Sequence, residues 1–153
     1  MNKLLFVCTG NLCRSPTAET IFNALAEEHG LDWRAESAGL AAVEGEPVPE
    51  NVGLALGEVG FYADEHRARK VESRMIGEAD LVLAMTPRQT EKIARLAGSP
   101  GEDRLHTLTG YLGEGGSGEV PDPHGYPLST HRASVRRIYD YVERLVERLR
   151  SLP

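Results

Sequence analysis

Eight consecutive residues near the start of the chain combine a thiol, an arginine and residues typical of a tight turn. They read Cys8-Thr9-Gly10-Asn11-Leu12-Cys13-Arg14-Ser15 and follow a short apolar run. Ser15-Pro16 is typical of a helix start, because Ser caps helices and Pro is favoured in their first turn. Backbone N–H groups in such a turn and at a helix N-terminus converge on a bound anion, and Gly10 permits backbone conformations closed to other residues. The sequence therefore predicts an anion-binding loop.

Two side chains of this loop could do chemistry on a bound phosphate. Arg14 carries a planar, permanently charged fork that grips two phosphate oxygens. Cys8 lies at the mouth of the loop, and helix N-termini and nearby cations activate thiols as thiolates. A thiolate that faces a phosphate can attack phosphorus and form a phosphocysteine, with Ser15 as a hydrogen-bond donor. A buried strand cysteine beside a surface arginine is the alternative, and it explains neither the turn nor the helix start.

Another candidate group lies far along the chain, in a segment rich in Gly and Pro. Residues 110–127 show no periodicity, and long loops of this kind in compact domains are more often functional than idle. Asp122 lies in this segment and is followed by Pro123, which stiffens the backbone. A carboxylic acid there could give a proton to a departing alkoxide or phenoxide. Taken alone, an Asp-Pro pair favours a simple turn.

Composition narrows the function classes. The chain has 153 residues, of which 41% are hydrophobic and 26% charged, which is typical of one globular domain, here residues 1–153. Its formal net charge of −6 argues against a nucleic-acid partner. The apolar run before Cys8 is too short for a signal peptide, and no run is long enough to span a membrane. We therefore expect a cytoplasmic protein with reduced cysteines and no membrane partner. No residues have metal-ligand spacing, so we expect no metal and no cofactor.

Apolar runs of strand length alternate with helical patterns along the chain. This alternation predicts an α/β single-domain, three-layer fold in which helices flank both faces of a parallel sheet. Ligands bind at the carboxyl ends of the strands in such folds, and Cys8 ends the first strand. Strands are predicted at residues 3–8, 33–38, 81–85 and, weakly, 105–108, and helices at residues 15–30, 49–59, 71–77, 86–96 and 129–152.

These segments together resemble the low-molecular-weight protein tyrosine phosphatases over nearly the whole chain. Residues 8–16 are similar to the signature loop of that family almost letter for letter. The resemblance implies a four-stranded parallel sheet flanked by helices, with a phosphate-binding loop after the first strand, and a reaction without a metal. Further segments that look like family motifs are Ser37-Ala38-Gly39, His66-Arg67-Ala68-Arg69, residues 79–85 and Val120-Pro121-Asp122-Pro123.

The resemblance also implies a role for each matched position. Cys8 would be the nucleophile, Arg14 the phosphate clamp, and Ser15 the residue that holds the leaving thiolate. Asp122 would be the general acid and then the base that activates water. The loop would be completed by Thr9, Gly10, Asn11, Leu12 and Cys13. Asn11 would keep the loop in its unusual conformation, supported by hydrogen bonds from Ser37 and His66. Cys13 could also form a reversible disulfide with Cys8, which would protect the nucleophile from over-oxidation.

The resemblance points to two substrates. Members directed at phosphotyrosine carry an aliphatic residue at the position of Leu12, whereas a branch that dephosphorylates arginine carries Thr there. Leu12 therefore favours phosphotyrosine. His124 and Gly125 stand where tyrosine-directed members often place aromatic residues, with Tyr126 one position later, and Ala84-Met85-Thr86 is similar to the arginine-directed branch. The resemblance predicts a protein tyrosine phosphatase with His124 and Tyr126 at the substrate rim, and a protein arginine phosphatase is the alternative.

A function without catalysis is the other alternative. A redox switch or phosphate sensor would use Cys8 and Cys13 but would leave Arg14, Ser15 and Asp122 without a role. The chain has two cysteines, so it lacks the further thiols that arsenate reductases on this fold need. The expected partner is a phosphorylated protein, with phosphate or another oxyanion in the loop. The remaining histidines, His29, His106 and His131, are predicted at the surface or at helix ends.

Overall fold

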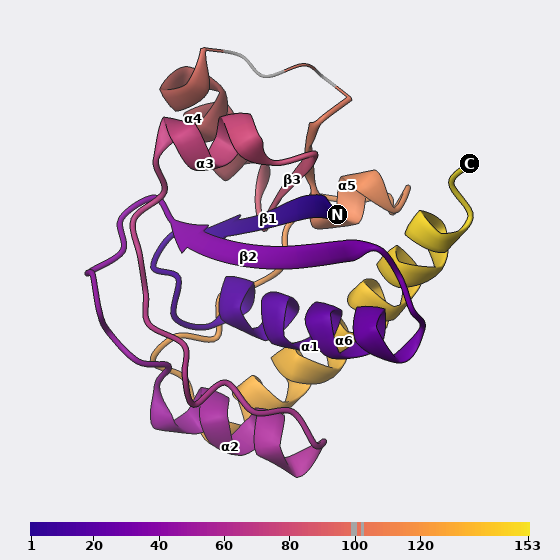
Figure 1. Ribbon diagram of the computed structural model, residues 1–153. Coiled ribbons are helices and arrows are strands. Elements are labelled where there is room, and N and C mark those ends of the chain that lie inside the picture. The colour runs from indigo at the N-terminus through magenta and orange to yellow at the C-terminus, as the bar shows by residue number, and fades with distance from the viewer. Residues whose placement is uncertain (99–100, 102) are drawn as a thin grey trace.

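Four parallel strands, in the order β2-β1-β3-β4, form the central sheet (Figure 1). The computed structural model describes residues 1–98, 101 and 103–153. The strands are β1 (Asn2–Cys8), β2 (Trp33–Gly39), β3 (Leu81–Ala84) and β4 (Leu105–Thr107). The helices are α1 (Arg14–Glu28), α2 (Glu50–Glu58), α3 (Ser73–Glu78), α4 (Pro87–Ala97), α5 (Leu108–Tyr111) and α6 (Leu128–Arg150). The predicted α/β fold with a flanked four-stranded parallel sheet is confirmed.

The apolar runs of β1 and β3 are buried because helices cover both faces of the sheet. Successive side chains of a strand point to opposite faces, so Leu4 and Phe6 pack with α1 and α6, whereas Leu5 and Val7 pack with α3 and α4. Figure 1 shows the pair α3 and α4 on one side of the sheet and α1, α2 and α6 on the other. No helix in the described part of the chain is both long and apolar enough to cross a membrane.

Most predicted elements are present, with shifted ends. The largest correction is α5, which lies inside the stretch predicted to be strand and loop. The Thr107 hydroxyl accepts a hydrogen bond from Gly110 N–H at 2.9 Å and caps this helix. A helix of four residues is too short to show a periodicity. At α4, which was predicted, Thr86 and Gln89 form a reciprocal capping box.

The start of α1 differs from the prediction in a way that matters for the site. The helix begins at Arg14, with Cys13 as its N-cap and without a side-chain hydrogen bond to the cap. Ser15 was expected to cap, but its hydroxyl lies inside the first turn and contacts Cys8 instead. The N–H groups of a first helical turn have no intrahelical partner, so this helix end leaves donors available to an anion.

The loop before α6 returns across the ends of the strands. Val120 N–H donates to Met85 O at 2.8 Å, directly after β3. Val120 is buried, so this bond anchors the loop beside the sheet. Asp122 follows two residues later and lies near Cys8 at the carboxyl end of β1. This is the end of the strands at which ligands bind in α/β folds.

Candidate active site

The Cys8 sulfur lies at the base of a small pocket at the carboxyl end of β1. The pocket has a volume of about 170 Å³. Ser15 Oγ lies 2.9 Å from the sulfur, and Asn11 N–H donates to it at 3.2 Å. Both groups can donate to a negatively charged sulfur. The pocket is lined by Cys8, Thr9, Gly10, Leu12, Cys13, Arg14, Asp122 and His124.

Asn11 shapes the loop from behind the pocket. Its φ of 56° is the one positive value among the non-glycine residues that the structure describes, and such a conformation is costly unless its surroundings hold it. The Asn11 side chain donates to Ser15 Oγ and Ser37 Oγ, both at 2.9 Å, and accepts from Arg69 N–H at 3.0 Å. His66 Nε2 donates to Asn11 O at 2.7 Å. The structure thus brings Ser37 and His66 to Asn11, as expected.

A carboxylate that the sequence analysis did not assign to the site extends this network. Ser37 Oγ donates to Glu19 Oε1 at 2.5 Å. Burial raises the pKa of Glu19, and the hydrogen bond from Ser37 and the charges of His66 and Arg69 oppose that rise. Glu19 lies one turn after Ser15 on α1, so the two side chains lie on the same face of the helix. This spacing could have indicated that Glu19 belongs to the site.

The other wall of the loop is supported by α4. Gln89 Nε2 donates to Thr9 Oγ1 at 3.1 Å, and Gln89 Oε1 accepts from Met85 N–H at 2.9 Å. Gly39 at the end of β2 allows the loop to approach closely, because a Cβ there would lie 2.7 Å from Thr9 O. Nothing local in the sequence indicates that Gln89 contacts the loop, because its partner there, Thr9, is 80 residues away.

Arg14 is buried, with 5% of its surface exposed, and lines the pocket of Cys8. Its Nη1 donates to Val120 O at 3.0 Å, and its Nη2 lies 3.6 Å from Asp122 Oδ2. Its Nε is buried and has no hydrogen-bond partner among the described residues. A buried guanidinium N–H without an acceptor is costly, and a bound oxyanion would supply that acceptor.

Asp122 lines the same pocket and is half exposed. Its Oδ1 accepts from His124 N–H at 3.1 Å, and the His124 ring lies 3.9 Å from the Cys13 sulfur. The structure therefore brings a thiol, a guanidinium and a carboxylate to one pocket. None of the described residues form a cluster of three or more His, Cys, Asp or Glu that could hold a metal ion.

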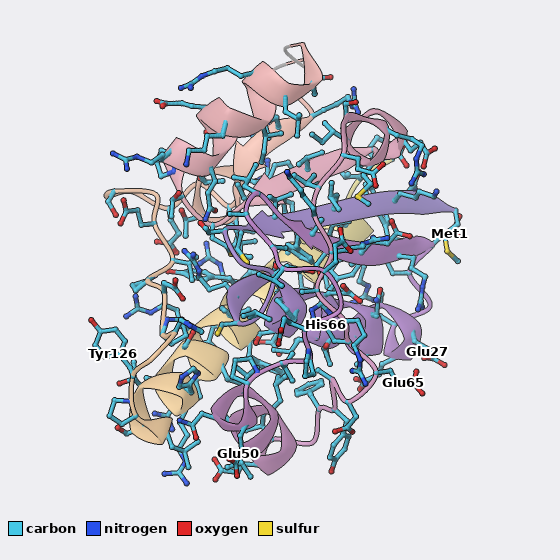
Figure 2. The ribbon with its side chains drawn as sticks, turned by 90° about the vertical axis from the view of Figure 1, so that its left-hand side faces the viewer. Met1, Glu27, Glu50, Glu65, His66 and Tyr126 are labelled. Carbon is cyan, nitrogen blue, oxygen red and sulfur yellow. The ribbon has the colours of Figure 1, made fainter. Side chains whose placement is uncertain are left out.

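Tyr126, expected at the substrate rim, does not line this pocket. Tyr126 N–H donates to Pro123 O at 3.0 Å in a turn with Gly125 at φ 81°. The side chain is 59% exposed, and Figure 2 shows it extending outward at the periphery of the molecule. The place of Tyr126 at the substrate rim stays a prediction.

His131 lies at a helix end, which is one of the two places predicted for it. It is in the first turn of α6, but it is buried there, with only 3% of its surface exposed. Burial lowers its pKa, and the neighbouring His124 adds to this effect, whereas a hydrogen bond with the Tyr126 backbone and the charge of Asp122 oppose it. His131 precedes Val135 by four positions and so continues the apolar stripe of α6, which was a readable signal.

Comparison with known proteins agrees with this geometry. Residues 3–151 match the family described as low molecular weight phosphotyrosine protein phosphatase. A protein-arginine-phosphatase of Bacillus subtilis is 35% identical over 97% of both chains. The structure of a low molecular weight protein tyrosine phosphatase from T. tengcongensis has a TM-score of 0.88 and 36% identity over 97% of this chain and 99% of that one. A variant of the arginine phosphatase YwlE with a phosphorylated active-site serine has a TM-score of 0.91 and 31% identity over 97% and 96%. The chain belongs to the low molecular weight phosphotyrosine protein phosphatase family and is a cysteine-dependent phosphatase.

Proposed function

We propose that the chain hydrolyses phosphotyrosine in proteins through a phosphocysteine on Cys8. The observation that carries this proposal is one pocket lined by the Cys8 thiol, the Arg14 guanidinium and the Asp122 carboxylate. The substrate phosphate binds in the loop. One of its oxygens accepts a hydrogen bond from Arg14 Nε–H, which has no partner among the described residues. The Cys8 sulfur attacks phosphorus as the phosphorus–oxygen bond to the leaving group breaks. Asp122, which lines the same pocket, gives its proton to the departing oxygen.

The second step regenerates the enzyme. The Asp122 carboxylate takes a proton from a water molecule, whose oxygen attacks phosphorus while the phosphorus–sulfur bond breaks. The electron pair of that bond returns to the Cys8 sulfur, where Ser15 Oγ at 2.9 Å donates a hydrogen bond to the thiolate. Inorganic phosphate then leaves.

Leu12 supports phosphotyrosine as the substrate. Its half-buried side chain lines the pocket, where an aliphatic group can pack against an aryl ring. Phosphoarginine is a second candidate, because the arginine phosphatase of Bacillus subtilis matches this chain over 97% of its length. Tyr126 is not among the residues that line the pocket. The phosphotyrosine ring would therefore have no aromatic contact with Tyr126 there, which also favours this second candidate.

Hydrolysis of matched phosphotyrosine and phosphoarginine peptides separates the two. We expect kcat/KM for phosphotyrosine to be higher by about tenfold or more, as apolar contacts in a pocket allow. Leu12→Thr removes the apolar contact and is expected to lower this ratio. A wild-type preference for phosphoarginine, or a ratio that Leu12→Thr leaves unchanged, would show that Leu12 does not select the substrate.

We further propose that Cys13 protects Cys8 through a reversible disulfide, and that the protein works in the reducing cytoplasm, where both thiols stay free. Burial and, next, the charge of Asp122 raise the pKa of Cys13 to about 12, so it is a thiol at neutral pH. Hydrogen peroxide would oxidise the Cys8 thiolate to a sulfenic acid and release hydroxide. The Cys13 sulfur would then attack the sulfenic sulfur, which forms the disulfide and releases water.

This redox step should depend on pH. At saturating peroxide, disulfide formation is expected to speed up about tenfold per pH unit between pH 6.5 and 8.5, because the Cys13 thiolate attacks and its fraction grows by that factor. Mass spectrometry of the tryptic peptide 4–14, which contains both cysteines, measures the loss of two hydrogens. In Cys13→Ser, thiol treatment should restore less of the starting activity than in the wild type. Equal recovery in both proteins would contradict a protective disulfide.

A further inference from the structure

Asp122 separates two hollows of the surface. On one side it lines the pocket of Cys8, and on the other it lines a second pocket between residues 120–123 and α6. Thr130, Ser134 and Arg137 are spaced by four and three positions, which places them on one face of the helix, and all three line this second pocket. We call it the Arg137 pocket. In Figure 1 the loop that contributes residues 120–123 is orange, and α6, which follows it, is yellow.

The Arg137 pocket has the size and lining of a site for one side chain. Its volume of about 140 Å³ is below the roughly 300–1,000 Å³ typical of pockets for cofactors and drug-sized ligands. Val120 and Pro123 give it apolar walls, which suit the methylene groups of an extended side chain. Its two charged groups are Asp122 and Arg137, and Asp122 is turned toward Arg14 at 3.6 Å.

The Arg137 guanidinium is available to a ligand. It is exposed and forms no ion pair with any residue that the structure describes, whereas Arg132 on the same helix pairs with Glu58 at 2.7 Å. A free guanidinium binds a carboxylate through two parallel hydrogen bonds. The pocket therefore combines an apolar cleft with a positive end, which is the chemistry that recognises Glu or Asp.

We propose that the Arg137 pocket binds an acidic side chain of the substrate polypeptide, close in sequence to the phosphorylated residue. The inference rests on the proposed function, since Asp122 lines both pockets and a peptide whose phosphate lies beside Cys8 can extend past Asp122 into the Arg137 pocket. Arg137 is then a specificity-determining residue that favours phosphorylated sites in acidic surroundings.

Paired phosphopeptides test this directly. Each pair carries Glu or Gln at one position within three residues of the phosphorylated residue, and each variant is described by its own Glu-to-Gln ratio of kcat/KM. For the wild type we expect a ratio of about five at one or more positions, as for a well-formed exposed ion pair, and a lower ratio at high salt. Arg137→Ala should bring the ratio to about one. Arg137→Glu should reverse it, so that Lys at that position is preferred to Gln.

Arg136→Ala is the matched control. Arg136 is the neighbouring arginine and is also exposed, but it lines a different hollow with Phe61 and Tyr139, so the Glu preference should persist. A wild type without Glu preference, or a preference that survives Arg137→Ala, would overturn the inference. Hydrolysis of a small aryl phosphate by the wild type tests the proposed function separately: turnover there without a Glu preference leaves that function standing, and no turnover overturns both.

Discussion

Cys8→Ser is expected to lower kcat for a small aryl phosphate by about 10⁴-fold or more, the scale on which removal of a catalytic nucleophile acts. The serine hydroxyl stays protonated at neutral pH and is a far weaker nucleophile than a thiolate. The two groups that contact the Cys8 sulfur, Ser15 Oγ and Asn11 N–H, donate hydrogen bonds and do not take up a proton. Steady-state hydrolysis measures the loss. The effect is chemical and not structural, since Ser fills nearly the same volume as Cys at the end of β1.

Phosphate binding by the same variant is the control for that experiment. The Arg14 side chain and the backbone donors of the loop do not depend on the Cys8 sulfur, so the Cys8→Ser protein should still bind inorganic phosphate. Calorimetry or a shift in melting temperature with added phosphate measures this binding. Turnover above about one per cent of the wild-type rate, in protein free of wild-type enzyme, would refute Cys8 as the nucleophile.

Asp122→Asn is expected to have the second-largest effect, and its size should depend on the leaving group. Loss of a general acid costs about 10²–10⁴-fold when the leaving oxygen needs a proton. Phenyl phosphate, which has a poor leaving group, should therefore slow much more than nitrophenyl phosphate. The rate constants for a series of substituted phenyl phosphates, plotted against the pKa of the leaving phenol, give the comparison.

The amide of that variant preserves the loop. Its Oδ1 can still accept from His124 N–H, as the carboxylate does at 3.1 Å. The amide cannot give a proton to the leaving group, and it does not form an ion pair with Arg14. An equal loss for all leaving groups would exclude Asp122 as the acid and would assign it to the positioning of Arg14.

The parts of the site that could be predicted are those that are contiguous in sequence. Cys8, the turn after it and the start of α1 lie within nine residues of each other, so local propensity and residue type carried the prediction. The resemblance to a family supplied Asp122, which on its own favours a turn. Contacts between distant segments could not be predicted in this way. Val120 O accepts a hydrogen bond from Arg14, 106 residues away, and because every residue has a backbone oxygen, the residue type gives no indication of this contact.

The burial of His131 could not be predicted from its residue type. Its polarity favours an exposed position, but its place on the apolar stripe of α6 determines its burial. The geometry of the helix outweighed the type of the residue.

The network around Asn11 has a consequence for the thermodynamics of substrate binding. The strained backbone at φ 56° is held by hydrogen bonds within the protein, which Asn11 donates to Ser37 and accepts from His66 and Arg69. The loop is therefore ordered when the chain folds, and its conformational entropy is lost at that stage. An arriving phosphate meets donors that are already aligned, so its interaction energy is not consumed in ordering the loop and goes into affinity. The strained loop therefore lowers the free energy of unfolding of the protein and not its affinity for the substrate.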